Sequence, residues 1–394
     1  MPGGAPTSSA PAPTAMSGHQ NNGATPVAIR LDAVDKVFPG ASEPAVRGLS
    51  LDVRRGETVA LIGPSGCGKT TTLRMINALI RPSAGRIEVE SVDIASESVA
   101  ELRRGIGYVI QQVGLFPHRT IAQNIGTVPK MTGWDKQRIR ERIDELVDLV
   151  GLERDMLRRY PDELSGGQQQ RVGVARALAA DPPVLLMDEP FGAVDPLVRA
   201  RLQDELIALQ ERVNKTIVLV THDLDEAIKL ADRIALLNVG GILEQYDSPD
   251  DLLRAPANDF VERFVGGDRS LRRLTLARVD ELPFEQGPVV EHSASQAEAL
   301  EAMERCGTDW FGLTRDGRFL GWVHRERIDG GPIDDLQREP AAAQILPHST
   351  LREAMEVIVT SSTETAVIDD DGRFGGVVTL EQIRERLGTA VQAA

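Results

Sequence analysis

The sequence predicts an α/β fold with a parallel sheet, joined to a second, repetitive domain. Three short apolar runs, ETVALIG, PPVLLMDEP and KTIVLVTHD, have the composition of buried parallel strands, and helical stretches separate them. Such alternation over residues 27–265 is typical of an α/β domain. The composition changes after Gly267, because residues 268–394 contain no lysine, 14 arginines and 23 acidic residues, a net charge of −9. The 394 residues exceed the usual span of one hydrophobic core, so we expect more than one domain.

Composition divides the chain into three parts. Residues 1–26 contain no Lys, Arg, Asp or Glu and are dense in Pro, Gly, Ala, Ser and Thr, which predicts a disordered tail. Residues 27–267 form the expected α/β domain, which opens with two alternating strands, VAIRLDAV and AVRGLSLDV. The segment from about 113 to 165 is helical and lacks buried-strand runs, so we expect an inserted helical subdomain there.

The last part, residues 268–394, contains an internal repeat. Ser295–Ile328 falls on Thr350–Ile383 after a shift of 55 positions, and both copies contain an E-A-x-E motif and the tetrapeptide DGRF. Each copy, at about 285–330 and 340–388, is predicted to run helix, strand, DG turn, strand, helix. Two such units side by side would bury one shared core.

Charge and hydropathy exclude several classes of protein. The net charge is −15 (44 basic minus 59 acidic) and the pI is about 5.0, which argues against nucleic acid as a partner. Cys67 and Cys306 form no motif, as expected of a chain in a reducing compartment. No apolar run approaches the length of about 18 residues that spans a bilayer. We therefore expect a soluble protein that can still dock on a membrane partner.

A glycine-rich loop carries the strongest chemical signal. GPSGCGKT follows the apolar strand TVALI and precedes the helical segment TTLRMINALI, which is the context that a phosphate-binding P-loop requires. Lys69 is expected to reach the β- and γ-phosphate oxygens of ATP, and the Thr70 hydroxyl is expected to bind Mg²⁺. Cys67 is read as a small loop residue without chemistry. The predicted nucleotide-binding residues of the loop are Gly63, Pro64, Ser65, Gly66, Cys67, Gly68, Lys69, Thr70 and Thr71.

Two carboxylates follow the buried strand of PVLLMDEP. Asp188 comes at the carboxyl end of the strand, where open α/β sheets bind ligands, and can hold Mg²⁺ through water. Glu189 is placed to polarise the attacking water. An Asp-Glu pair after an apolar run fits a structural role equally well, and the P-loop is what favours the catalytic interpretation.

Two further polar residues end apolar strands. His222 follows TIVLV and would lie near the γ-phosphate if its strand neighbours that of Asp188. Gln111, in YVIQQ, can contact both the metal ion and the attacking water. Each residue by itself fits an ordinary structural role as well as a catalytic one.

A second glycine-rich segment, LSGGQ, begins a polar and then alanine-rich helix. Ser165 suits a helix N-cap, and the glycines after it allow a ligand to approach the backbone. The order and spacing of GPSGCGKT, Gln111, LSGGQ, LLMDEP, Val194-Asp195 and Thr221-His222 resemble those of the ATP-binding-cassette (ABC) ATPases over all of 27–265. That resemblance implies a RecA-like P-loop core with antiparallel β and helical subdomains, and ATP and Mg²⁺ as ligands.

The resemblance also implies a head-to-tail homodimer that encloses two ATP molecules. The residues that would cap the γ-phosphate on the partner's P-loop are Ser165, Gly166, Gly167 and Gln168. Asp195 resembles the residue that couples the two sites across the dimer. Phe38 matches the aromatic residue that stacks on adenine in the family, although a phenylalanine in an apolar-rich strand can also be core.

A narrower resemblance concerns the transported solute. Three segments, IGYVIQQVGLFPHRTIAQNI, RYPDELSGGQQQRVGVARALAADPP and THDLDEAIKLADRIALL, strongly resemble ATPase subunits of importers for quaternary-amine osmoprotectants: glycine betaine, carnitine, choline or proline betaine. It implies separate transmembrane permease subunits, one of which would dock near Gln111–Gln112, and indirectly a substrate-binding protein. The chain would then lie on the cytoplasmic face of the cell membrane, held there by the permease. The alternatives are an ABC importer ATPase for another small solute and a soluble ABC ATPase without a transport role.

The C-terminal repeat resembles the tandem CBS domains that such subunits carry. It departs from nucleotide-binding CBS units, because Gln382 and Arg327 stand where an aspartate usually holds a ribose. The chain also ends in an uncharged segment, GTAVQAA, where some relatives have an acidic tail. Nucleotide binding, ionic-strength sensing by acidic faces, and simple dimerisation therefore remain open.

Overall fold

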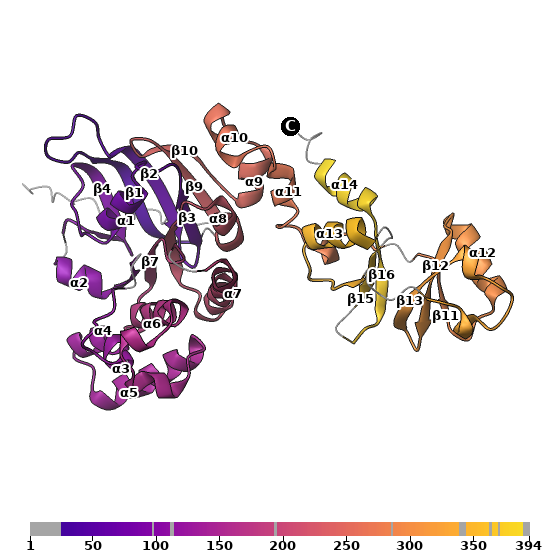
Figure 1. The fold of residues 1–394 in the computed structure, drawn as a ribbon. Coiled ribbons are helices and arrows are strands. Elements are labelled where there is room, and N and C mark those ends of the chain that lie inside the picture. The colour runs from indigo at the N-terminus through magenta and orange to yellow at the C-terminus, as the bar shows by residue number, and fades with distance from the viewer. Residues whose placement is uncertain are drawn as a thin grey trace, which may run out of the picture.

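The protein is seen in a computed structural model (Figure 1). Residues 25–96, 98–110, 114–192, 195–284, 287–338, 344–361, 365–368 and 371–388 are described. An N-terminal body of mixed α/β structure is followed by a smaller C-terminal body that contains the repeat (Figure 1). The predicted tail, residues 1–26, lies outside the described residues except for its last two positions.

A six-stranded sheet forms the centre of the N-terminal body. Its order is β10-β9-β3-β8-β7-β6, and all neighbours are parallel except the antiparallel edge pair β10–β9. Every residue of β3, β7 and β8 is buried, as the apolar runs predict. The strands are β3 Thr58–Ile62, β6 Ile106–Val109, β7 Val184–Asp188, β8 Thr216–Val220, β9 Arg233–Asn238 and β10 Ile242–Asp247.

A second, antiparallel sheet has the order β2-β1-β4-β5. Burial alternates along β2, which confirms the half-buried strand expected from its pattern. The strands are β1 Val27–Lys36, β2 Val46–Arg54, β4 Ala84–Val89 and β5 Val92–Asp93. This sheet and the central sheet share one apolar core with α1 (Lys69–Ile76) and α2 (Val99–Arg104).

The segment between β6 and β7 is helical, and no strand occurs in its described residues 114–165. Its helices are α3 Ile121–Ile125, α4 Thr127–Met131 and α5 Lys136–Leu149, with 3₁₀ turns at Arg154–Arg158 and Pro161–Glu163. It continues into α6 (Gly166–Leu178), which packs with α5 and α7 (Pro196–Val213) over the opposite side of the central sheet. The remaining helices of this body are α8 Leu224–Leu230, α9 Pro249–Arg254, α10 Asp259–Val265 and α11 Arg269–Arg273.

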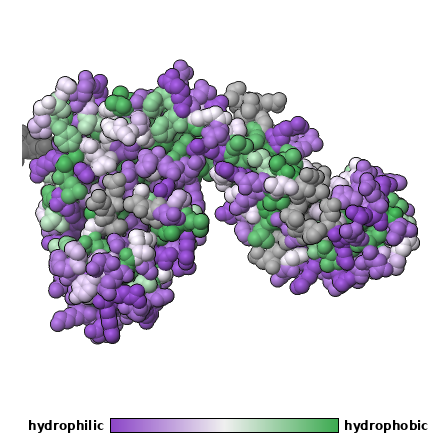
Figure 2. Space-filling view, in the orientation of Figure 1, coloured by the Kyte–Doolittle hydropathy of each residue, from purple (hydrophilic) through white to green (hydrophobic). Residues whose placement is uncertain are grey.

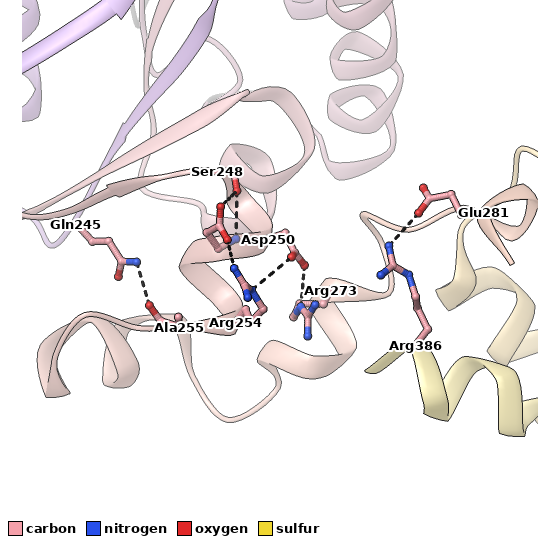
Figure 3. A network of polar contacts seen from close by, with 9 residues as sticks. Gln245, Ser248, Asp250, Arg254, Ala255, Arg273, Glu281 and Arg386 are labelled. Carbon is pink, nitrogen blue, oxygen red and sulfur yellow. Dashed lines mark hydrogen bonds and ion pairs between the residues drawn. The ribbon is translucent and has the colours of Figure 1, made fainter. Parts of the chain in front are cut away.

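Polar contacts occur on both sides of the junction between the two bodies, which falls just after α11. The Arg273 guanidinium donates to Asp250 of α9 at 2.7 Å, and Arg386 donates to Glu281 at 3.1 Å (Figure 3). Two residues after Arg272, Leu274 enters the core of the second repeat unit. Arg272 itself pairs with Asp225 in the first turn of α8 at 2.8 Å.

The two repeat units have the same sheet topology, with a parallel pair followed by an antiparallel pair. Their helices begin 55 residues apart, the offset of the sequence repeat. The first unit contains β11 Val289–Glu291, α12 Gln296–Cys306, β12 Trp310–Arg315 and β13 Arg318–His324. The second contains β14 Gln344–Ile345, α13 Leu351–Ser361, β15 Thr365–Ile368, β16 Phe374–Val378 and α14 Leu380–Gly388.

The units differ from the expected pattern in two ways. Each opens with a short strand, β11 or β14, that the sequence analysis did not predict. The closing helix predicted for both units forms only in the second, because the first ends in a 3₁₀ turn at Arg325–Arg327. Gly330, Gly331 and Pro332 follow that turn, and glycine and proline prevent its extension into an α-helix.

The face drawn in Figure 2 is largely hydrophilic, with hydrophobic residues in small separate groups. None of the helices in the described part of the chain is both long and apolar enough to cross a membrane.

Candidate nucleotide site

The P-loop lies between β3 and α1, and the surrounding backbone leaves no room for a side chain at two of its glycines. Gly63 has φ +143°, and a Cβ there would overlap the carbonyl oxygen of Leu237. Gly68, the N-cap of α1, has φ +99°, and a Cβ there would overlap the carbonyl oxygen of Ala45. Side chains are therefore excluded, and the loop backbone can wrap closely around an anion at the start of α1.

Lys69 is folded into this loop. Its ammonium group donates to the carbonyl oxygens of Gly63 at 2.7 Å and Pro64 at 3.1 Å, and the residue is 8% exposed. Ser65 and Gly66 are exposed at the rim. The ammonium group therefore lies beside the first N–H groups of α1. Both a cation and the N–H groups at a helix start bind phosphate oxygens favourably.

Thr70 and Asp188 meet at the carboxyl end of β7. The Thr70 hydroxyl donates to the Asp188 carboxylate at 2.9 Å. Burial raises the pKa of Asp188, which is only 5% exposed, and this shows that the charged form lacks full compensation there. Oxygen ligands with uncompensated charge fit a hard divalent cation such as Mg²⁺.

Tyr108 and Arg74 also belong to this environment, and the sequence analysis missed them. The Tyr108 hydroxyl bonds Asp188, and burial followed by the charge of Asp188 raises the pKa of Tyr108. The Arg74 charge acts on both groups and opposes these rises. The only signal in the sequence was the tyrosine within the apolar run IGYV, and its role becomes visible only when β6 pairs with β7.

Glu189 and His222 lie side by side. The Glu189 carboxylate is 3.4 Å from His222 Nδ1, because β7 and β8 are neighbours in the sheet. Glu189 has φ +46°, a left-handed conformation that is uncommon for a residue with a side chain and that is often found at functional sites. Its N–H donates to the Val220 carbonyl at 2.9 Å, which holds the strained backbone in place. Gln111 lies outside the described residues.

The LSGGQ segment, Leu164–Gln168, is called the signature segment below; its Ser165 is the N-cap of α6, as the sequence predicts. The Ser165 hydroxyl accepts from the Gln168 N–H at 3.3 Å, and the Gln168 side chain accepts from the Ser165 N–H at 2.9 Å. Ser165 and Gly166 are exposed, and a Cβ at Gly166 would meet no described atom within 4 Å. The start of α6 lies with α3 and α5, away from α1 (Figure 1).

Two other predicted residues are at the surface. Asp195 is the N-cap of α7, where its side chain accepts from the Leu197 N–H at 3.0 Å, and it is exposed. Phe38 lies beyond the end of β1 and is 40% exposed, with the Lys36 ammonium 5.1 Å from its ring centroid. Phe38 is therefore not a core residue, and its ring is open to stacking.

Comparison with known proteins identifies this arrangement. A family model described as ABC transporter matches residues 46–192. The solved structure titled "Dimeric Structure of MJ0796, a Bacterial ABC Transporter Cassette" aligns with a TM-score of 0.51 and 34% identity over 56% of this chain and 98% of that chain. The N-terminal body thus has the fold of an ABC nucleotide-binding cassette.

Similarity to curated proteins extends further along the chain. It is 45% identical over 359 residues to the glycine betaine/carnitine/choline transport ATP-binding protein OpuCA of Bacillus subtilis (strain 168), covering 89% of this chain and 94% of that protein. It is also 45% identical over 372 residues to the osmoprotectant import ATP-binding protein OsmV of Salmonella typhimurium, covering 92% and 96%. The chain therefore belongs to the ABC transporter ATPases.

Proposed function

We propose that this chain is the ATP-hydrolysing subunit of an importer for an osmoprotectant of the glycine betaine, carnitine, choline or proline betaine type. The observation that carries the proposal is the 45% identity to OpuCA over 89% of the chain, a share that includes part of the C-terminal repeat. Binding and hydrolysis of ATP would power uptake, while the solute would pass through other subunits.

In this proposal the P-loop holds the phosphates of ATP. The ammonium of Lys69 leaves the carbonyls of Gly63 and Pro64 and binds the β- and γ-phosphate oxygens, and the exposed Phe38 ring stacks on adenine. Thr70, Asp188 and Gln111 would hold Mg²⁺, which supplies charge neutralisation at the phosphate oxygens. The uncompensated charge of buried Asp188 supports that assignment.

Glu189 and His222 would carry out the hydrolytic step. The Glu189 carboxylate orients the attacking water and accepts its proton, and His222 donates to the γ-phosphate. The 3.4 Å separation of the two side chains supports a shared role, because one small reacting group can contact both.

A second copy of the chain would complete each site. Ser165, Gly166 and Gly167 would bind the γ-phosphate held by the partner's P-loop, and Asp195 would couple the two sites. The open space around Gly166 supports this assignment: no described atom of its own chain requires a glycine there, so its small size serves a contact from outside.

The permease would dock beside the helical subdomain, on the cytoplasmic face of the membrane. A cavity of about 290 Å³ between that subdomain and β6 is lined by Phe116, Thr127, Val128, Arg104 and Tyr108, among others. Phe116 is 38% exposed. Tyr108 lines the cavity and also bonds Asp188, so a docked helix would contact a residue of the nucleotide site.

We further propose that 27–267 and 268–394 are the cassette and a tandem CBS domain. Gln382, which replaces the ribose-binding aspartate, is engaged in a helix cap: it accepts from the Thr379 N–H at 2.9 Å and donates to the Pro283 carbonyl at 2.8 Å. Its side chain thus has a structural use, which favours sensing or dimerisation over nucleotide binding in the second unit.

The test is uptake of labelled glycine betaine at high external salt by cells that carry either the wild-type chain or Lys69→Ala as their sole betaine-importer ATPase. Collapse of uptake with Lys69→Ala supports the osmoprotectant importer, and competition by carnitine and choline then ranks the solutes. Uptake at the wild-type level would refute the osmoprotectant assignment and leave the ATPase assignment intact.

A further inference from the structure

We propose that Glu226 is a positioning residue of the ATPase site, which holds the His222 turn in register with helix α7. The proposal rests on the role proposed above for His222 and Glu189, and it adds a residue to which the sequence analysis assigned no role. Glu226 contacts neither nucleotide nor water in this scheme and acts through Thr221, Asp223 and Arg199.

Glu226 is a buried acid with an incomplete set of partners. It lies in the first turn of α8, four residues beyond His222, and is 5% exposed. Its Oε1 atom has no hydrogen-bond partner among the described residues. A buried carboxyl of this kind costs stability, so its presence calls for an explanation.

The Glu226 carboxyl is joined to the turn that carries His222. The Thr221 hydroxyl bonds Glu226, and the same oxygen accepts from the Asp223 N–H at 3.0 Å. Thr221 is 2% exposed, and its N–H donates to Leu61 of β3 at 3.3 Å. The residues on both sides of His222 are therefore tied to one buried group.

Glu226 is also linked to α7, the helix whose N-cap is Asp195. The Arg199 guanidinium is 3.7 Å from the Asp223 carboxylate, and its charge acts on Glu226. The Arg199 N–H donates to the Asp195 carbonyl at 2.8 Å, in the first turn of the helix. The two helices are joined again by Lys229 and Asp204 at 2.7 Å, and they are adjacent in Figure 1. A shift of α7 would therefore reach the His222 turn through Arg199 and Glu226.

Burial and the neighbouring charges make Glu226 change its protonation state near neutral pH. Burial, and then the charge of Asp223, raise its pKa to about 7, with a smaller contribution from Glu189. The Thr221 hydroxyl and Arg199 oppose the rise. The protonated acid bonds the turn without adding a charge beside Glu189, whereas the ionised form repels Glu189 and Asp223 and attracts Arg199. An amide can replace the protonated acid but not the carboxylate.

The test compares Glu226→Ala and Glu226→Gln with Glu211→Gln, a matched change at an exposed glutamate near the end of α7. The kcat and KM for ATP would be measured on the dimeric protein from about pH 6 to about pH 8. We expect Glu226→Ala to lose about tenfold or more in kcat with KM nearly unchanged, because misplacement of a catalytic group affects the chemical step. Glu226→Gln should retain most of kcat at the low end of the range. The ratio of wild-type to Glu226→Gln kcat should fall as pH rises through about 7, where Glu226 ionises.

Two results would overturn the proposal. One is a kcat of Glu226→Ala equal to that of Glu211→Gln. The other, which applies even if the alanine variant does not fold, is a Glu226→Gln profile that parallels wild type at every pH. Glu189→Gln and His222→Ala in the same assay separate the two proposals: full turnover in these variants would refute their proposed roles, whereas a failure confined to Glu226 would refute only the positioning role.

Discussion

The P-loop and the signature segment are both glycine-rich helix starts, yet their own chain treats them differently. At Gly63 and Gly68 the fold itself excludes side chains, since each Cβ would overlap a backbone carbonyl of a neighbouring segment. At Gly166 the chain leaves open space, and the residue before it is exposed. The geometry of the P-loop is thus set within one chain. The signature segment instead presents an open surface, and under the proposed function the partner subunit's nucleotide would contact it.

Folding of a single subunit is therefore enough to form the P-loop, whereas the site at the signature segment would form only on dimerisation. Lys69 and the glycines around it are fixed by packing between β3, α1 and the neighbouring strands, so their geometry exists in a single subunit. The capping box of Ser165 and Gln168 fixes only the start of α6 and leaves its outer face free. Under the proposed function, one chain carries two halves of different sites.

The largest expected effect on ATPase activity comes from a substitution in the P-loop. Lys69→Ala removes the buried cation that meets the phosphate oxygens, and we expect ATPase activity to fall by on the order of 100-fold or more. ATP binding, measured by fluorescence of a labelled analogue, should weaken in the isolated subunit too. Loss of turnover with unchanged binding by the single subunit would contradict the view that this half is self-sufficient.

Glu189→Gln should separate binding from hydrolysis. The amide keeps the shape of the side chain but cannot accept the proton of water, so turnover should fall on the order of 100-fold while ATP remains bound. Size-exclusion chromatography with ATP should then show a dimer that wild type forms only transiently. Hydrolysis by this variant at the wild-type rate would refute the role assigned to Glu189.

A substitution at the signature segment should leave ATP binding by the single subunit unchanged and prevent formation of the ATPase site between two subunits. Ser165→Arg fills the open face of α6, and we expect an activity loss of about tenfold to 100-fold with unaltered binding of ATP by the single subunit. Mixing Ser165→Arg with Lys69→Ala sharpens the comparison, because a head-to-tail heterodimer then regains one site with both halves intact.

Recovery of activity in that mixture, above the sum of the two variants alone, would support sites shared between chains. A control mixture of Lys69→Ala with Lys69→Ala,Ser165→Arg contains no intact site and should stay inactive. Equal activity in both mixtures would place the signature segment outside the nucleotide site.

The smallest effect concerns stability at Glu226, which lies between the two halves. Its folded-state pKa of about 7 exceeds its ordinary value of 4.5, so the folded protein binds the extra proton and loses stability as pH rises between these values. Glu226→Gln lacks this loss, and its free energy of unfolding should exceed that of wild type by up to on the order of 3 kcal/mol at about pH 8. Urea denaturation at about pH 5 and about pH 8 would measure the gap; a gap that narrows as pH rises would contradict the burial of an acid here.

Much of the fold was predictable because its signals are local. The runs TVALI, VLLMD and TIVLV are apolar throughout, and β3, β7 and β8 are buried at every position. The 55-residue repeat reappeared as two sheets of one topology, since the same alternation and the same DG turn direct both. The helix predicted after β13 failed where a Gly-Gly-Pro run interrupts it.

The sequence by itself determined the loops that carry the chemistry: the P-loop, the carboxylates after β7 and the helix cap at Ser165. These features depend on residue type and near neighbours in the chain, because glycine conformation, strand burial and helix capping are short-range effects. Only the tertiary structure decided which of these groups meet. The pairing of β7 with β8 and β6 places Glu189 beside His222 and Asp188 beside Tyr108. Glu226 is buried in α8, which an ion pair of Lys229 with Asp204 joins to α7, and Phe38 is exposed beyond the end of β1. Such contacts join residues far apart in the chain, and their free energies depend on the packing of the whole domain.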